Sequence, residues 1–408
     1  MSQYVVPYNR RGTLFGDEEI VALKKLLLES DKTLSGGEER EAFEAEFAAY
    51  VGAKYAVSVT SCTVALELAT YLLNLQPGNV VIVTPQTYWA SINPLLDIDV
   101  NVRFCDIDSN SLNLDPARLA DLICANTRAI YVTHYGGLMA NMDPILNIAE
   151  RYGLFVIEDC AHAHGSEYRG QRPGTLGDIG CFSFQSMKNM STLGEGGMIT
   201  LKEPRWLDIL RRLREGEPDA EFVPRTSSMI GPYRKNESLD RHEKNAFTHD
   251  CSTIRRHGTN AIMSEPAALI GRIQLERLPS LIQKRRSIAS RLNEGLSRVP
   301  GLRIQHEPEG FFHSYHLYTF FVEPDSGIDH EALITLIDAT GVEIQMRYFP
   351  LHLLSEWRLR GGLPGLCPIA EKVWFEQQVN LPIYPSLTED QVDFMIKTVE
   401  WAVGKARL

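Results

Sequence analysis

The sequence lacks three features that would place the chain outside the cytoplasm. Its seven cysteines form no Cys-x-x-Cys pair and no regular spacing, which is typical of reduced, mostly buried thiols. No stretch approaches the roughly eighteen uninterrupted apolar residues that a membrane span needs, and the first residues lack the apolar core of a signal peptide. We therefore expect a cytoplasmic protein without a membrane span.

An excess of positive charge is absent as well. The chain has 41 Lys and Arg against 52 Asp and Glu, a formal net charge of -11. Nucleic-acid binding needs a basic face, so this balance argues against nucleic acid as a partner. An anionic small ligand is not excluded, because the local placement of charges decides whether one binds.

What is present is an ordinary globular composition with an alternating pattern. The length of 408 residues suits two domains or one large domain with an appendage. Between residues 40 and 200 we expect strands at 55–59, 80–83, 102–106, 129–133 and 155–157, separated by helices at 38–50, 63–75, 116–123 and 145–152. Strands separated by helices imply a mostly parallel sheet with both faces covered, so the fold class is α/β.

The second half of the chain has a different texture. Residues 215–257 are polar and charged with little periodicity, which indicates a long excursion from the core. Helical patterns follow at 263–281 and 281–299, and then strands at 318–322 and 342–346 with helices at 330–339 and 389–403. We predict a large domain over 1–280, containing the excursion, and a smaller α/β domain over 281–408.

The residue with the strongest chemical indication is Lys188. It lies in a small, apolar, glycine-rich stretch, downstream of the acidic pair Glu158-Asp159 that ends an apolar run. Pyridoxal phosphate (PLP) needs a lysine for its aldehyde and a carboxylate for its ring nitrogen. Lys188 and Asp159 are our candidates for these two tasks.

The remaining needs of PLP also have candidates at strand ends. The turn that contains Cys62 and Thr63 joins a strand to a helix and could offer backbone amides to a phosphate. Taken alone, however, the turn is better explained as an ordinary helix N-cap. Ser183 could add a phosphate contact. Tyr88 follows the strand at 80–83, where it could stack on a ring or simply pack in the core.

Taken in order, these residues resemble the DegT/DnrJ/StrS-type sugar aminotransferases, PLP enzymes of the aspartate-aminotransferase fold (fold type I). The resemblance runs from about residue 14 to residue 400. The matching stretches are 61–66, 85–88, 134–137, 158–165, 177–184, 188–197, 258–265, 313–318 and 381–385.

The resemblance implies a role for each candidate. Lys188 would form the Schiff base and move the proton, Asp159 would pair with the pyridine nitrogen, and Tyr88 would stack on the ring. His162 would lie near the cofactor hydroxyl. The phosphate would be bound by Cys62, Thr63 and Ser183, and by Asn260 of a neighbouring subunit, so a homodimer with shared active sites is expected.

The chain departs from the family pattern at three places. Cys62 stands where the family usually has glycine, which puts a glycine-only backbone angle there in doubt. Ile262 stands where the family usually has arginine, which weakens the expectation of substrate contacts nearby. The 215–257 segment is longer than expected for a compact member.

Two histidine pairs and one basic segment invite other interpretations. His162 with His164, and His313 with His316, could suggest a metal, but two imidazoles without a matching cluster are more often structural, so we predict no metal site. The basic residues of 225–256 could bind a nucleotide diphosphate or could form a solvated loop. They are Arg225, Arg234, Lys235, Arg241, Lys244, Arg255 and Arg256.

The function expected from the resemblance is transfer of an amino group from L-glutamate or L-glutamine to a nucleotide-linked keto-sugar in amino-sugar biosynthesis. A keto-cyclitol of the inosose type is the alternative acceptor. Related PLP-dependent sugar dehydratases carry histidine in place of the lysine, so Lys188 disfavours that reaction. An intact set of Asp159, Ser183 and Lys188 disfavours a non-enzymatic regulator.

Overall fold

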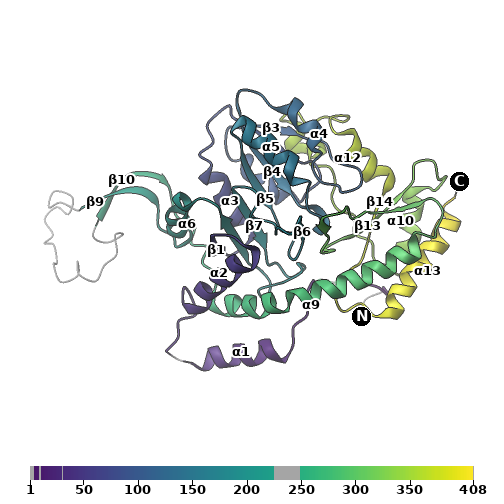
Figure 1. The fold of residues 1–408 in the computed structure, drawn as a ribbon, viewed down its shortest axis with the longest axis horizontal. Helices are drawn as coiled ribbons and strands as arrows, with labels where there is room; N and C mark the ends of the chain where they lie inside the picture. The colour runs from purple at the N-terminus through teal and green to yellow at the C-terminus, as the bar shows by residue number, and fades with distance from the viewer. Residues whose placement is uncertain (1–3, 9–10, 30, 225–248, 408) are drawn as a thin grey trace. The chain divides into compact units, whose positions relative to one another are not determined.

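A computed structural model describes residues 4–8, 11–29, 31–224 and 249–407 (Figure 1). The chain divides into two compact units, Met1–Lys202 with Met263–Leu408, and Glu203–Ile262. The boundary between a large and a small domain at residue 280 stays a prediction.

The first unit is built on a seven-stranded sheet of order β1-β8-β7-β5-β4-β2-β3. Its strands are β1 (Tyr55–Val59), β2 (Val80–Val83), β3 (Asn101–Phe104), β4 (Thr127–Thr133), β5 (Phe155–Asp159), β7 (Ile179–Ser183) and β8 (Gly197–Leu201). Neighbours from β3 to β7 are parallel, and β8 runs antiparallel to β7 and β1. The predicted α/β class is confirmed, and each predicted strand of this region has its counterpart.

Helices in this part of the chain follow the apolar periodicity. They are α1 (Asp17–Leu28), α2 (Glu38–Val51), α3 (Cys62–Leu72), α4 (Pro116–Leu119) and α5 (Met142–Tyr152). The α5 helix buries Met142, Ile145 and Ala149 on one face and ends at Gly153, whose left-handed φ of 62° suits glycine. The α3 helix packs on β7 and β8. Because it begins three residues after β1, its first turn lies at the carboxyl end of that strand.

The C-terminal part contains a second, smaller sheet of order β11-β13-β14, formed by Leu302–Ile304, Tyr318–Val322 and Gln378–Leu381. The helices α10 (His330–Ala339) and α13 (Glu389–Lys405) confirm two of the predicted helices. The predicted segments 263–281 and 281–299 form one helix, α9 (Glu265–Leu296), which packs on α2 at one end and on α13 at the other (Figure 1). Shorter elements here are β6 (Glu167–Tyr168), β12 (Phe311–Phe312), α11 (Ser355–Arg358) and α12 (Pro368–Lys372).

Single turns of helix complete the first unit. They are η1 (Trp89–Ser91), η2 (Asn93–Leu95), η3 (Ala120–Leu122), η4 (Tyr135–Gly137), η6 (Leu351–Leu353) and η7 (Val373–Gln377). Of these, η4 lies just after β4, and η1, which lies between β2 and β3, carries Trp89 and Ser91 of the site described below.

The predicted strand at 342–346 is wrong. Only Val342 forms a β-bridge, with Val6. Beyond it, the backbone N–H of Ile344 donates to a carboxylate oxygen of Asp338, at 3.1 Å, and that of Arg347 donates to the Asn380 side chain, at 3.0 Å. Side-chain acceptors therefore replace the ladder that a strand would need.

The second unit contains η5 (Pro204–Trp206), α6 (Leu207–Arg214) and an antiparallel pair, β9 (Asp219–Pro224) and β10 (His249–Arg256). The pair lies within the segment predicted as an excursion, and its strands were missed. The basic residues predicted as diphosphate ligands between 225 and 248 lie outside the described residues.

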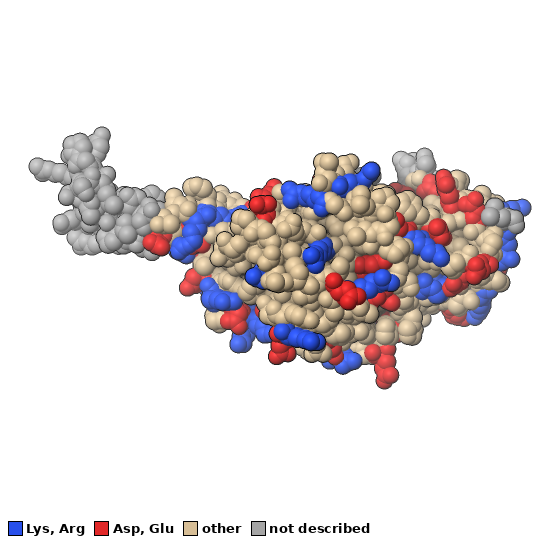
Figure 2. All heavy atoms as spheres, turned by 90° about the horizontal axis from the view of Figure 1, so that it is seen from above, with Lys and Arg blue, Asp and Glu red and all other residues tan. Residues whose placement is uncertain are grey.

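Surface charge, helix length and cysteine burial were all subjects of expectations from the sequence. On the face shown in Figure 2, acidic and basic side chains of the described residues are interspersed. None of the described helices is both long and apolar enough to cross a membrane. The six described cysteines are unpaired, and five of them are buried, which confirms that part of the prediction.

Candidate active site

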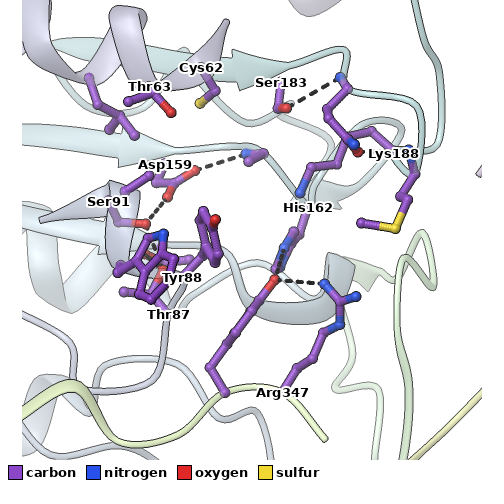
Figure 3. A pocket seen from close by; sticks show the side chains of 18 of the residues that line it. Cys62, Thr63, Thr87, Tyr88, Ser91, Asp159, His162, Ser183, Lys188 and Arg347 are labelled. Carbon is purple, nitrogen blue, oxygen red and sulfur yellow. Dashed lines mark hydrogen bonds between the residues drawn. The ribbon is translucent and has the colours of Figure 1, made fainter. Parts of the chain in front are cut away.

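A cavity of about 790 Å³ opens at the carboxyl ends of the parallel strands. Open α/β sheets bind ligands at this edge, and the volume suits a small-molecule site. Seven of the predicted site residues line it (Figure 3): Cys62, Thr63, Tyr88, Asp159, His162, Ser183 and Lys188. The remaining one, Asn260, belongs to the second unit, and its contact with a neighbouring subunit stays a prediction.

Lys188 lies in the loop between β7 and β8, and its side chain reaches into the cavity (Figure 3). Its ammonium forms no hydrogen bond or ion pair with any described residue. Burial lowers the pKa of Lys188 from 10.5 to about 8, a shift that Asp159 opposes and Arg347 reinforces. An amine with this pKa is partly free base near neutral pH, so it can act as a nucleophile.

Asp159 ends β5 and is 7% exposed. One carboxylate oxygen accepts from the Ala161 backbone N–H at 3.0 Å, and the other accepts from the Ser91 hydroxyl. No described cation lies within ion-pair distance. A buried carboxylate without a cation is costly, so this group is suited to a cationic ligand atom in the cavity.

A chain of buried hydroxyls leads to Asp159. The Thr133 hydroxyl donates to that of Thr87 at 3.1 Å, and Thr87 and Ser91 are 2.7 Å apart. With Thr133 donating to Thr87, the remaining protons point along the chain, so Ser91 donates to Asp159 (Figure 3). The sequence analysis missed both Ser91 and Thr133. Thr133 ends β4, a position of the kind where other candidates were found, whereas Ser91 lies in η1, beyond the end of β2.

The first turn of α3 borders the opposite part of the cavity. Ser61 is the N-cap, and its side chain accepts from the Val64 N–H at 3.3 Å. The first two N–H groups, those of Cys62 and Thr63, have no intrahelical acceptor, and the helix dipole favours an anion there. The turn is therefore an N-cap whose free N–H groups can also bind an anion.

Cys62 does not need to be glycine. It is the first helical residue and is absent from the described residues with positive φ. The close approach occurs instead at Gly197, where an added Cβ would lie 2.5 Å from the Ser61 carbonyl carbon. Gly197 starts β8 and pairs with Val59 and Ser183, so its missing side chain lets the α3 turn lie against the sheet edge.

His162 is neutral and fixed in one tautomer. Burial is the main cause that lowers its pKa well below 6.5. Its Nδ1 accepts from the Gly136 N–H at 3.3 Å, so Nε2 carries the proton and donates to the Tyr348 hydroxyl at 3.1 Å. Its ring centroid is 4.3 Å from that of His316.

Tyr88 has an exposed ring in the cavity. It is 47% exposed, and its ring centroid lies 5.4 Å from that of Trp89 and 5.8 Å from that of Tyr348. Its face is therefore available to a flat ligand ring.

A further wall was missed by the sequence analysis. Gln345, Arg347 and Tyr348 line the cavity. Gln345 belongs to the segment 342–346 that was wrongly predicted as a strand, and the other two residues follow it. Arg347 donates to the Tyr348 hydroxyl at 3.3 Å and to the Gln345 side chain at 3.0 Å. No local pattern in the sequence marks this segment as part of a site.

Within each predicted histidine pair, the first and second rings have different neighbours. His162 faces the cavity, whereas His164 packs against Phe182 and Phe184, with centroids 5.6 Å from each. His313 stacks on Tyr315, with ring centroids 3.9 Å apart.

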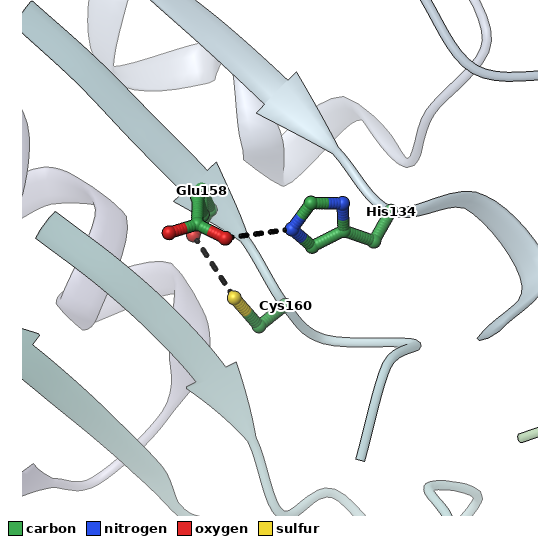
Figure 4. Close-up of side chains that lie close together, drawn as sticks. All are labelled: His134, Glu158 and Cys160. Carbon is green, nitrogen blue, oxygen red and sulfur yellow. Dashed lines mark hydrogen bonds and ion pairs between the residues drawn. The ribbon is translucent and has the colours of Figure 1, made fainter. Parts of the chain in front are cut away.

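Three potential metal ligands do meet among the described residues: His134, Glu158 and Cys160 (Figure 4). Nδ1 of His134 accepts from the Ala140 N–H at 3.2 Å, so Nε2 is protonated and donates to Glu158 at 2.9 Å. Glu158 also accepts from the backbone N–H groups of residues 174, 176 and 177. The imidazole has no lone pair left for a metal, and the group instead anchors the 174–177 loop to β5.

Several known proteins are similar to this chain in both sequence and fold. SpsC of Bacillus subtilis (strain 168), a spore coat polysaccharide biosynthesis protein, is 33% identical over 398 residues, 97% of this chain and 96% of SpsC. The aminotransferase TlmJ from Streptoalloteichus hindustanus superposes with a TM-score of 0.83 at 29% identity, covering 98% of this chain and 99% of TlmJ. DesV of S. venezuelae, solved in complex with a ketimine intermediate, gives a TM-score of 0.80 at 30% identity over 95% and 94% of the two chains.

The model of one family matches residues 15–400, nearly the range predicted from the sequence motifs. The family and the enzyme class expected from the resemblance are thereby confirmed. This chain belongs to the DegT/DnrJ/EryC1/StrS aminotransferase family and is an aminotransferase.

Proposed function

We propose that this aminotransferase uses PLP to move an amino group from L-glutamate or L-glutamine to a nucleotide-linked keto-sugar in amino-sugar biosynthesis. Aminotransferases of the family depend on PLP. The observation that carries the proposal for this chain is the buried carboxylate of Asp159, which has no described cation partner, in the same cavity as the Lys188 amine. A protonated pyridine nitrogen would supply the cation that Asp159 needs.

The other lining residues suit the rest of the cofactor. The N–H groups of Cys62 and Thr63, with the Ser183 hydroxyl, would hold the phosphate. Tyr88 would lie on the ring face, and His162 beside the ring hydroxyl. These roles are carried over from the family motif onto residues that share one cavity.

Lys188 would supply both nucleophile and proton carrier. Its lowered pKa, about 8, lets Nζ lose a proton to bond the aldehyde carbon and later accept and return one. PLP, when bound, supplies an electron sink for the charge that develops at the amino-bearing carbon. A histidine at this position, as in the related dehydratases, could not form that bond.

The acceptor is the least constrained part of the proposal. SpsC is named for polysaccharide biosynthesis, which supports a sugar. We further propose a cytoplasmic homodimer in which Asn260 contacts the cofactor phosphate of the neighbouring subunit.

The test starts from the purified protein with PLP. Borohydride should fix the cofactor to Lys188, and Lys188→Ala should lower kcat by at least about 10⁴-fold, because nucleophile and proton carrier are lost together. A Lys188→Ala variant with full turnover would sink the mechanism.

The acceptor is tested with enzyme whose cofactor has first taken up the amino group of the donor, mixed with a panel of nucleotide-linked keto-sugars and free inososes. Return of the absorbance of the aldehyde form of the cofactor with a nucleotide-linked sugar supports the proposal. Return with inososes alone would replace the acceptor by a keto-cyclitol and keep the aminotransferase.

A further inference from the structure

Arg347 is a cation at the cavity without a carboxylate partner among the described residues. Other arginines of the chain, such as Arg272 and Arg291, each contact two carboxylates. Arg347 is half-buried and contacts only neutral groups, the Tyr348 hydroxyl, the Gln345 amide oxygen and the Tyr8 ring. A guanidinium held this way keeps N–H groups for an anion that enters the cavity.

The backbone of Arg347 is held firmly by distant residues. Its carbonyl oxygen accepts from the side chains of Tyr135 and Gln378, and its N–H donates to the Asn380 side chain at 3.0 Å. The side chain therefore extends from a fixed backbone position, and its own hydrogen bonds to Tyr348 and Gln345 hold the guanidinium at the cavity.

Tyr348 provides a second donor beside it. Its hydroxyl oxygen accepts from Arg347 and from Nε2 of His162, which leaves its own proton for a ligand. Burial raises the pKa of Tyr348 to about 12, so the phenol keeps this proton at neutral pH. Arg347 and Tyr348 thus offer a charged and a neutral donor side by side.

The position of Arg347 limits what it can bind. Arg347 and Lys188 line the main cavity and also share a second small cavity, of about 20 Å³. In an α-amino acid, two bonds of about 1.5 Å each separate the nitrogen from the carboxylate carbon. A diphosphate is separated from a sugar's keto carbon by more bonds. A cation that shares both cavities with the lysine, the small one included, therefore suits the α-carboxylate better.

We propose that Arg347 and Tyr348 bind the α-carboxylate of the amino donor while its nitrogen lies beside Lys188. This inference rests on the proposed function. It assigns donor recognition to the segment 345–348 rather than to the sheet edge.

The experiment compares L-glutamate with its α-amide, L-isoglutamine, in the donor half-reaction, followed by the loss of the absorbance of lysine-bound cofactor. The wild type should prefer L-glutamate by about 10- to 100-fold in kcat/KM, the range of a charged hydrogen bond. Arg347→Gln should bring this preference close to one. Arg347→Lys should keep an intermediate preference, because the charge remains but the fork is lost.

Matched controls separate this role from folding and from the proposed function. Arg360→Gln removes an exposed arginine whose contact is the Leu96 carbonyl, and it should keep the wild-type preference. Guanidinium should restore L-glutamate turnover to Arg347→Ala, which damage to the fold would not allow. An unchanged preference in Arg347→Gln would overturn the inference alone, whereas a wild type that reacts with no amino donor would overturn the proposed function.

Discussion

The cavity has two walls that are built in different ways. Cys62, Asp159 and Ser183 each end or follow a strand of the large sheet, and the Lys188 loop follows directly after β7. The segment 345–348 has no regular structure and is placed by side chains such as Tyr135, more than two hundred positions away in sequence. The sheet wall carries a carboxylate and an amine, and the other wall carries a guanidinium and a phenol.

This difference suggests a division of labour between the walls. The carboxyl ends of the inner strands are rigid because each strand is hydrogen-bonded to a neighbour on both sides. Such a wall suits a cofactor that must stay in place. Irregular segments on a rigid scaffold often carry substrate-binding side chains, which suits a donor that binds and leaves in every cycle. Changes in the sheet wall should therefore alter cofactor binding, and changes in the segment 345–348 should alter donor preference.

Among variants that keep Lys188, the largest effect is expected at Asp159. Asp159→Asn removes the charge that faces the proposed pyridine nitrogen, and kcat should fall by about 10²- to 10³-fold, the cost of leaving a buried charge without its partner. PLP affinity should fall too, measured by titrating the apo protein and following absorbance. Arg347→Gln is the matched variant on the other wall and should leave PLP affinity near the wild-type value. Equal losses of PLP affinity in both variants would contradict the division of labour.

The same difference explains how much could be predicted from the sequence. Strands such as 55–59 and 80–83 were found because their apolar runs are short, β-branched and flanked by turns. The site residues of the sheet wall followed from them, since parallel strands present their carboxyl ends at one edge. Together with the family motifs, this gave seven residues that share the cavity.

The other wall could not be found this way. The alternation at 342–346 resembles a strand, but the backbone there bonds to Asp338 and Asn380 instead of to a neighbouring strand. These partners are brought close only by the fold of the small sheet and α10. Ser91 was missed for a related reason, since its hydroxyl gains a role only when η1 lies over the end of β5.

A smaller effect should link the two walls through the Lys188 amine. Its pKa is lowered to about 8 by burial, while Asp159 raises it and Arg347 lowers it. PLP incorporation needs the free base, so its rate should fall as pH drops through about 8 in the wild type. Losing the negative charge in Asp159→Asn should move this midpoint to lower pH, and losing the positive charge in Arg347→Gln should move it to higher pH.

The measurement is the rate of PLP incorporation into apo protein across a pH series, with borohydride trapping as the endpoint. Arg360→Gln, which changes an exposed arginine that does not line the cavity, serves as the neutral control. Midpoints that move in the same direction in both variants would show that the two charges do not act on Lys188 as inferred.

The smallest effect is expected within the sheet wall, at the hydroxyl chain. Ser91 donates to Asp159, so Ser91→Ala leaves one carboxylate oxygen without its donor. We expect about a 10-fold loss in kcat, as for a hydrogen bond to a charged group partly replaced by water, and recovery in Ser91→Thr. Thr133→Val, two hydroxyls further from Asp159, should cost less than Ser91→Ala because the bond to the carboxylate remains.

The pH dependence of the bound-cofactor absorbance separates this effect from mere loss of packing. If Ser91→Ala lowers kcat without moving that titration, the hydroxyl chain supports the wall but does not tune its carboxylate.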